Sequence, residues 1–177
     1  MLVAVTIFTL VIGSTTGLFI SAIRSQAKAL AAQKLLDETS YTIEYMSRFL
    51  RMAVKDKGGS CLTQPAQPGF NYQNPEGDVS SIRFIDYHGK CHEFFLDSGF
   101  LKERVSTNGS YDPGRPALEL TSEDFEVSSL NFNLSGQEGP PDEIQPRATI
   151  SLTIGKKPDL KPKITIQTTI SQRNLDL

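Results

Sequence analysis

The first 23 positions of the chain are apolar or uncharged, and this pattern predicts a membrane-spanning helix. Residues 1–23 are MLVAVTIFTLVIGSTTGLFISAI and contain no Asp, Glu, Lys or Arg. As an α-helix this stretch would be about 35 Å long, which is enough for the ~30 Å hydrocarbon core of a bilayer. A removed secretory signal peptide is the alternative, with Ala27, Ala29 and Ala31 as possible cleavage-site residues. The long apolar run and the lack of a preceding basic segment favour a membrane span instead.

The pattern changes after Arg24 but still predicts helix. No Pro or Gly occurs between Arg24 and Val54. Apolar or small side chains recur at steps of three and four, which places them on one face of an amphipathic helix over residues 24–57. The stripe consists of Leu36, Thr39, Ile43, Met46, Leu50 and Ala53. We expect the helix to end at Lys57-Gly58-Gly59 and to pack on the protein's own sheet, with a coiled coil as the alternative.

Residues 58–177 alternate between turn-rich loops and short β patterns, which predicts a β-rich globular head. Pro and Gly mark loops at 60–78, 106–116 and 136–146. Strands are expected at 81–87, 91–96, 100–105, 117–121, 125–134, 149–154 and 164–171. The apolar phase slips between Val127 and Leu130, which predicts a bulge. The fold class is therefore α+β, with a long N-terminal helix packed on an antiparallel β-sheet head.

Composition and candidate chemistry favour a non-catalytic protein. The formal net charge is -2 and no basic run occurs, so we expect no nucleic-acid partner. We find no nucleophile–base pattern, no phosphate-binding loop and no spaced carboxylate pair, and expect neither enzymatic activity nor a cofactor. An enzyme attached to the membrane is the least favoured alternative.

The two cysteines, Cys61 and Cys91, are predicted to form a disulfide in an oxidising compartment. Zinc binding by Cys61, Cys91, His88 and His92 is an alternative, although the spacing matches no standard zinc pattern. The loop carboxylates Asp142 and Glu143 are candidate calcium ligands, with solvated loop charges as the favoured interpretation. We therefore predict no metal site.

Gly13 and Gly17 are the candidate functional residues of the apolar segment. Small residues four positions apart allow two membrane helices to approach closely. Glycine also lowers local helix stability by about 1 kcal/mol relative to alanine. We predict that this pair supports helix packing or local melting.

The orientation of the segment is ambiguous. Arg24 and Lys28 follow the apolar run and no basic residue precedes it. By the positive-inside rule this would leave the head in the cytoplasm, whereas the cysteines favour the outside. A basic leader before Met1 would remove the conflict.

The segment Met1–Phe8, the following apolar run, the Gln- and Ala-containing helix and the β head together resemble the type IV pilin and type II pseudopilin superfamily. The likeness covers about the first third of the chain in sequence and the rest in architecture. The paired terminal strands, which end Ile170-Ser-Gln-Arg173-Asn174, are similar to those of a minor pilin or pseudopilin. The family's basic leader, its Gly-Phe cleavage site and the following Glu do not precede Met1. We therefore expect an N-terminally truncated member, with a degenerate member of the superfamily as the alternative.

The resemblance implies a structural subunit of a type IV pilus, a type II secretion pseudopilus or a DNA-uptake filament. Such a subunit waits in the bacterial inner membrane as a single-pass protein with an extracytoplasmic head, and then joins a periplasmic or cell-surface filament. Its partners would be other pilin-like subunits, a prepilin peptidase and an assembly platform. The alternative function is a single-span, membrane-anchored extracytoplasmic binding module that does not assemble into filaments.

Overall fold

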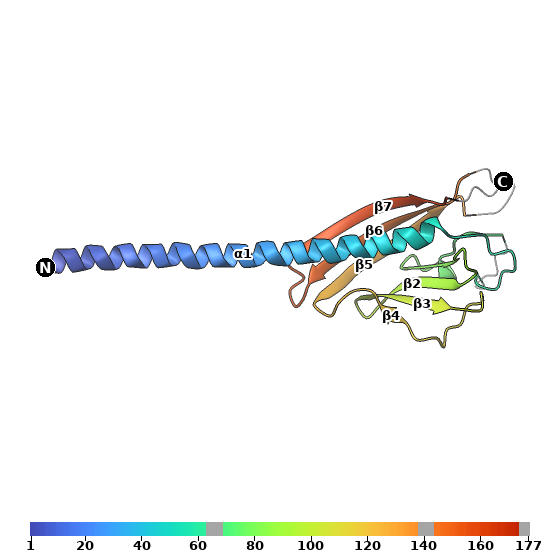
Figure 1. Ribbon diagram of the computed structural model, residues 1–177, viewed down its shortest axis with the longest axis horizontal. Coiled ribbons are helices and arrows are strands. Elements are labelled where there is room, and N and C mark those ends of the chain that lie inside the picture. Colours follow the sequence, from blue (N-terminus) through green and yellow to red (C-terminus); the bar gives the residue numbers. More distant parts are fainter. Residues whose placement is uncertain (63–68, 138–143, 174–177) are drawn as a thin grey trace.

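One long N-terminal helix carries the head on its C-terminal half. The computed structural model describes residues 1–62, 69–137 and 144–173. Helix α1 extends over Leu2–Arg51, and its N-terminal half projects free of the head (Figure 1). Alanine, leucine and other good helix formers, with no proline, explain the uninterrupted helix. The α+β class with a long N-terminal helix is confirmed.

Within α1, the buried stripe differs from the predicted stripe at two positions. Leu35 is fully buried whereas Leu36 is 46 % exposed, so the prediction for Leu36 was wrong. Thr42 is buried beside a half-buried Ile43. The buried residues are Leu35, Thr39, Thr42, Met46 and Leu50. Periodicity could not choose between two adjacent leucines, because either one continues a stripe with steps of three and four.

Helix α1 ends at Arg51, earlier than the predicted end at Lys57. The Val54 amide donates a hydrogen bond to the Ile85 carbonyl at 2.9 Å, so the chain joins the edge of a sheet at that point. The Arg173 amide donates to the last helical carbonyl, that of Arg51, at 2.9 Å. Tertiary hydrogen bonds therefore set the end of the helix before the glycines are reached.

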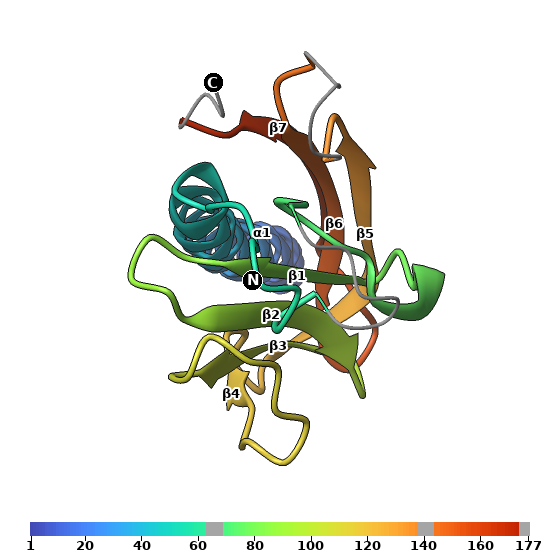
Figure 2. The same ribbon diagram turned by 90° about the vertical axis from the view of Figure 1, so that its right-hand side faces the viewer.

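The sequence predicted a head built on an antiparallel sheet, and the structure divides its strands between two antiparallel sheets. The bounds are β1 Ser81–Ile85, β2 Cys91–Asp97, β3 Phe100–Ser106, β4 Leu118–Glu119, β5 Phe125–Ser135, β6 Arg147–Lys156 and β7 Lys163–Ser171, with a short 3₁₀ turn η1 at Pro75–Gly77. The strand orders are β1-β2-β3-β4 and β5-β6-β7. Figure 2, a view along α1, shows the helix lying in the angle between the two sheets. All seven predicted strands are present, and β4 is the shortest.

Strand β5 joins the two sheets. The amides of Val127 and Phe132 donate to the carbonyls of Gly99 and Val79, at 2.8 and 2.7 Å. The register of β5 against β6 shifts between Val127 and Ser129, which confirms the predicted bulge. The bulge lets apolar side chains on both sides of it point inward although their spacing in the sequence is out of phase.

A single large core fills the space between α1 and the sheets. It is formed by Leu35, Met46, Leu50, Ala53, Tyr72, Ile82, Phe84, Phe94, Leu101, Phe125, Val127, Leu130, Phe132, Ala148, Ile150, Leu152, Ile154 and Ile170. The alternating pattern of β6 places Ile150, Leu152 and Ile154 in this core and leaves the intervening polar residues on the outer face. The helix and the head are thus one packed unit.

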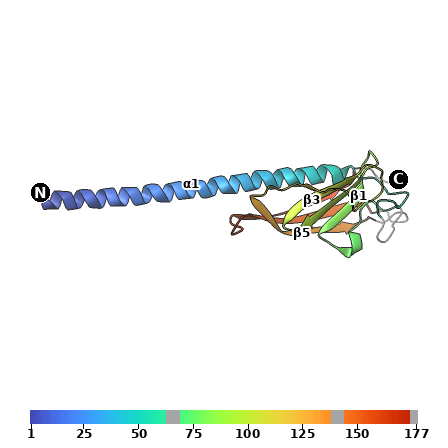
Figure 3. The same cartoon turned by 90° about the horizontal axis from the view of Figure 1, so that it is seen from below.

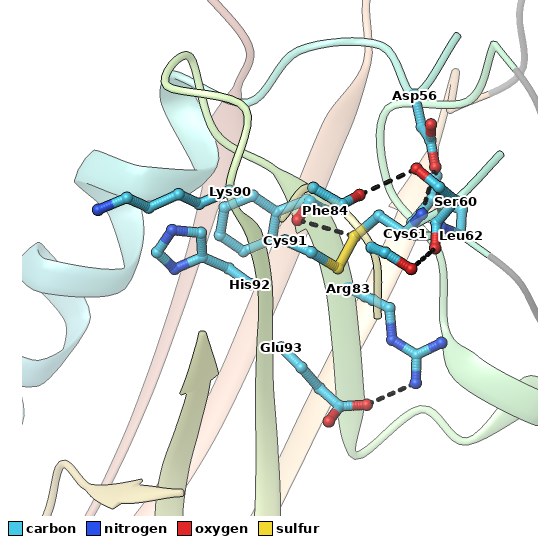
Figure 4. Close-up of a disulfide and its surroundings, with 12 residues drawn as sticks. Asp56, Ser60, Cys61, Leu62, Arg83, Phe84, Lys90, Cys91, His92 and Glu93 are labelled. Carbon is cyan, nitrogen blue, oxygen red and sulfur yellow. Dashed lines mark hydrogen bonds and ion pairs between the residues drawn. A yellow bond between two sulfur atoms is a disulfide. The ribbon is translucent and has the colours of Figure 1, made fainter. Parts of the chain in front are cut away.

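A disulfide staples the segment after α1 to the start of β2. Cys61 and Cys91 are bonded, with Cα atoms 5.5 Å apart (Figure 4). The carboxylate of Asp56 accepts the amide N–H groups of Cys61 and Leu62, each at 2.9 Å. The two cysteines lie in a second small cluster with Leu62 and Ile85. The segment is therefore fixed by a covalent bond and by a buried carboxylate.

Replacing both cysteines, as Cys61→Ala with Cys91→Ala, should destabilise the head. The bond closes a loop with a sequence separation of 30. Loss of its constraint on the unfolded chain should cost roughly 3–4 kcal/mol. Thermal unfolding of the full chain in detergent, followed by circular dichroism, measures the effect. Wild-type protein treated with a reductant should fall to the same midpoint. An unchanged midpoint in both samples would contradict a structural role for the bond.

Candidate functional site

The N-terminal half of α1 is an uncovered apolar surface. Every residue from Met1 to Leu30 is exposed, although most are hydrophobic. The large apolar side chains in this range are Met1, Leu2, Val3, Val5, Ile7, Phe8, Leu10, Val11, Ile12, Leu18, Phe19, Ile20, Ile23 and Leu30. In the described part of the chain, α1 is the one helix long and apolar enough to cross a bilayer, judged by length and composition. This half of α1 is compatible with a membrane anchor.

Five hydroxyl groups between Thr6 and Thr16 are hydrogen-bonded within the helix. Thr6, Thr9, Ser14, Thr15 and Thr16 each donate to a backbone carbonyl three or four positions earlier, at 2.8–3.1 Å. A polar group in hydrocarbon is costly unless it is hydrogen-bonded, so these internal bonds make the segment suitable for lipid.

Gly13 and Gly17 lie in open space on this surface. A Cβ atom added at either position would meet no atom within 4 Å. Nothing in the head therefore requires glycine at these two positions. Their effect on packing against a second helix remains a prediction.

Charged contacts join α1 to the head just beyond the exposed N-terminal half of the helix. The Lys34 ammonium lies 2.6 Å from an Asp124 carboxylate oxygen, and Glu38 accepts the backbone N–H of Ser122. The hydrogen bond from Lys34 lowers the pKa of Asp124 below its usual value, and the Lys34 charge adds to the effect. Both side chains are exposed, so the pair contributes little to stability. Its importance lies in its position at the junction where the free half of α1 begins.

A buried polar network that was not predicted connects α1 with the first sheet. His92 contacts Glu103 through Nδ1 at 2.9 Å and Asp86 through Nε2 at 3.2 Å. Its ring stacks on Phe84 and lies against Phe49 of α1. Each ring nitrogen of His92 therefore faces a buried carboxyl group. His92 is thus a structural residue of the interface between helix and sheet.

Tyr45 completes this network from the helix. Its hydroxyl donates to Glu103 Oε2 at 2.8 Å. Burial and then the hydrogen bond to Glu103 raise the pKa of Tyr45 above its ordinary value of 10.0. The turn Asp97-Ser98-Gly99 fixes the β2–β3 register, and strand alternation then places His92 and Glu103 on the same face as buried Phe94. The sequence could therefore have indicated that His92 and Glu103 share a face. It could not have indicated that Tyr45 of α1 and Asp86 contact them.

A second buried charge cluster lies on the opposite face of the same strands. Arg83 Nη2 lies 2.7 Å from Glu93 Oε1, and Arg104 pairs with the other oxygen of this carboxylate. The Arg83 guanidinium also lies over the Tyr111 ring, 3.4 Å from its centroid. Figure 4 shows Arg83 and Glu93 pointing toward one another beside the disulfide. Glu93 is therefore neutralised by two arginines, which makes its burial tolerable.

The proposed metal ligands do not come together in the described residues. Cys61 and Cys91 use both sulfur atoms in the disulfide, so the zinc alternative is wrong for them. His92 is bound in the polar network, and His88 lies against Tyr87. No group of three or more His, Cys, Asp or Glu residues with metal-binding geometry occurs where the chain is described. Asp142 and Glu143, the candidate calcium ligands, lie outside the described residues.

Comparison with protein-family models, with curated proteins and with solved structures found no match to this chain.

Tyr45 should give the protein a specific sensitivity to alkaline pH. Its raised pKa means that the neutral hydroxyl stabilises the fold fully below about pH 10, and that this contribution is lost as the pH rises further. Tyr45→Phe should lower stability near neutral pH by about 1 kcal/mol, because Glu103 loses a donor. The variant should also lose less stability than wild type as the pH rises above about 10.

Thermal unfolding of the full chain in detergent over a pH series measures both effects. Tyr41→Phe is the matched control, because Tyr41 lies one helical turn away and is 70 % exposed. If the stability of Tyr45→Phe falls as steeply with rising pH as that of wild type, the role assigned to Tyr45 is contradicted.

Proposed function

We propose that this protein is a structural pilin-like subunit, a minor pilin or pseudopilin, that assembles into a filament through α1. The observation that carries the proposal is the continuity of α1. The same helix that exposes an apolar half is packed into the core of the head over its other half.

A continuous helix supports assembly because it makes the exposed half and the head one rigid body. An anchor that only retains a domain at a membrane works equally well through a flexible linker. A subunit of an ordered filament needs its head at a fixed angle and height relative to the packed helices. The contacts from Lys34 to Leu50 fix that geometry. The apolar half can then be covered first by lipid and afterwards by neighbouring helices.

The proposed setting is the bacterial inner membrane, with the head on the extracytoplasmic side before assembly. The Cys61–Cys91 bond supports this side, since disulfides persist in oxidising compartments. By resemblance, the partners are other pilin-like subunits, a prepilin peptidase and an assembly platform. The filament would be a type IV pilus, a type II secretion pseudopilus or a DNA-uptake filament.

Photocrosslinking tests assembly against the alternative of an anchored binding module that stays monomeric. A benzophenone amino acid replaces Leu18, which is 73 % exposed on the free half of α1. Irradiated cells that produce the full chain with its assembly machinery should yield a ladder of multimers, because each copy can link to the next. Leu118 of β4, 64 % exposed on the head, is the control position. A protein that stays monomeric after irradiation at position 18 would favour the anchored module.

The double variant Gly13→Leu with Gly17→Leu should insert into the membrane normally but give a weaker multimer ladder. The added side chains would keep neighbouring helices apart, and leucine would also suppress local melting. The control is Thr15→Leu with Ala22→Leu, which enlarges two small residues on the opposite side of the helix. A ladder as strong as wild type in the glycine variant would contradict the role of the pair.

A further inference from the structure

The turn between β6 and β7 is a dense cluster of positive charge. Residues 156–163 are Lys-Lys-Pro-Asp-Leu-Lys-Pro-Lys, with four lysines and one aspartate. Lys156, Lys161 and Lys163 are exposed. The fourth, Lys157, places its ammonium 4.3 Å from the centre of the Phe100 ring. None of the four has an ion-pair partner within 4 Å among the described carboxylates.

The fold holds this cluster in a compact shape. The Leu160 carbonyl oxygen packs closely against Gly155. A Cβ atom at position 155 would lie 2.8 Å from this oxygen, so a larger residue would not fit there. The Lys156 amide donates to the Pro162 carbonyl at 3.1 Å across the base of the turn. The lysines are thus presented by an organised turn.

The cluster lies at the end of the head that faces the free half of α1. Figures 1 and 3 both show the β6–β7 turn as the part of the head nearest the N-terminal end of the helix. Asp124 connects it to the helix, because its carbonyl accepts the Lys157 amide at 3.0 Å while its carboxylate holds Lys34. The turn therefore stands at about the level of Lys34.

This level is close to the surface of a bilayer that α1 would span. Lys34 is eleven positions after Ile23, which is about 16 Å along a helix. The headgroup layer on each side of the hydrocarbon occupies about 5–8 Å of that distance. The remaining gap of about 10 Å is comparable to the Debye length at physiological ionic strength. Extended lysine side chains shorten it further.

We propose that the β6–β7 turn docks on anionic phospholipid headgroups of the membrane that α1 spans. The proposal rests on the membrane anchoring of the proposed function. Lysine side chains held near a membrane surface are attracted to anionic headgroups, and the attraction falls off within a Debye length. Arg24 and Lys28, between the span and the head, add to the same positive field. Docking would fix the tilt and rotation of the head before assembly, and entry into a filament would release it.

Energy transfer between the head and the lipid surface tests the docking. The full chain carries Thr165→Cys, labelled with a donor fluorophore, since Cys61 and Cys91 are bonded to each other. It is reconstituted in phosphatidylcholine vesicles with or without phosphatidylglycerol, which contain a headgroup-labelled acceptor lipid. Transfer should rise with phosphatidylglycerol and lose this increase at high salt.

Two charge-matched variants locate the effect. Lys161→Gln with Lys163→Gln should lose most of the increase that phosphatidylglycerol produces. Lys57→Gln with Lys90→Gln removes the same charge from exposed positions beyond the C-terminal end of α1 and should retain it. Equal loss in both variants, or transfer independent of phosphatidylglycerol, would overturn the proposal.

Two further controls separate the remaining explanations. If the increase disappears when the protein-to-lipid ratio is lowered, the lysines bind an acidic face of a second copy and the lipid proposal is overturned. Flotation of the vesicles after an alkaline wash reports anchoring separately. A chain that floats but shows no lipid-dependent transfer refutes the docking alone. A chain that does not float refutes both the docking and the membrane anchor.

Discussion

The burial of one face of the C-terminal half of α1 against two sheets is the constraint on which the rest of the structure depends. The helix from Leu35 to Leu50 supplies a side of the core that neither sheet can close alone. Because each sheet has one apolar face, both faces turn toward this single helix, and β5 joins the sheets beneath it. The exposed half of α1 has no such cover within the chain. Any stable state of the whole protein must therefore cover it with lipid or with other helices.

Polar groups inside this interface add specificity to apolar packing. Leucine and methionine side chains tolerate small sliding movements of a helix, whereas a buried carboxylate needs its partners in place. The Tyr45 hydroxyl on α1 donates to Glu103 on the sheet, so a shift of α1 by one turn would break this hydrogen bond. The same argument applies within the sheet to Glu93 and its two arginines. A fixed register between helix and head is what a subunit of an ordered assembly requires.

The two ends of the head differ in chemistry. The end nearest the free half of α1 carries the lysine turn and the contact between Lys34 and Asp124. The far end carries the Cys61–Cys91 bond, where the chain leaves the helix and enters the sheets. The covalent staple thus holds the least regular part of the chain, while charge is concentrated where a lipid surface would lie. This difference between the two ends is compatible with the proposed position of the head next to a membrane.

The sequence alone determined the long helix, the seven strands, the bulge in β5 and the pairing of the two cysteines. These features follow from local periodicity, from turn residues and from the presence of two cysteines only. Tertiary structure alone decided which leucine begins the buried stripe, where α1 ends and how the strands divide into two sheets. Leu35 rather than Leu36 is buried, and Val54 leaves the helix, because partners distant in sequence compete with local preference. The Tyr45–Glu103–His92 network and the position of the lysine turn likewise depend on contacts between distant segments, which local patterns do not contain.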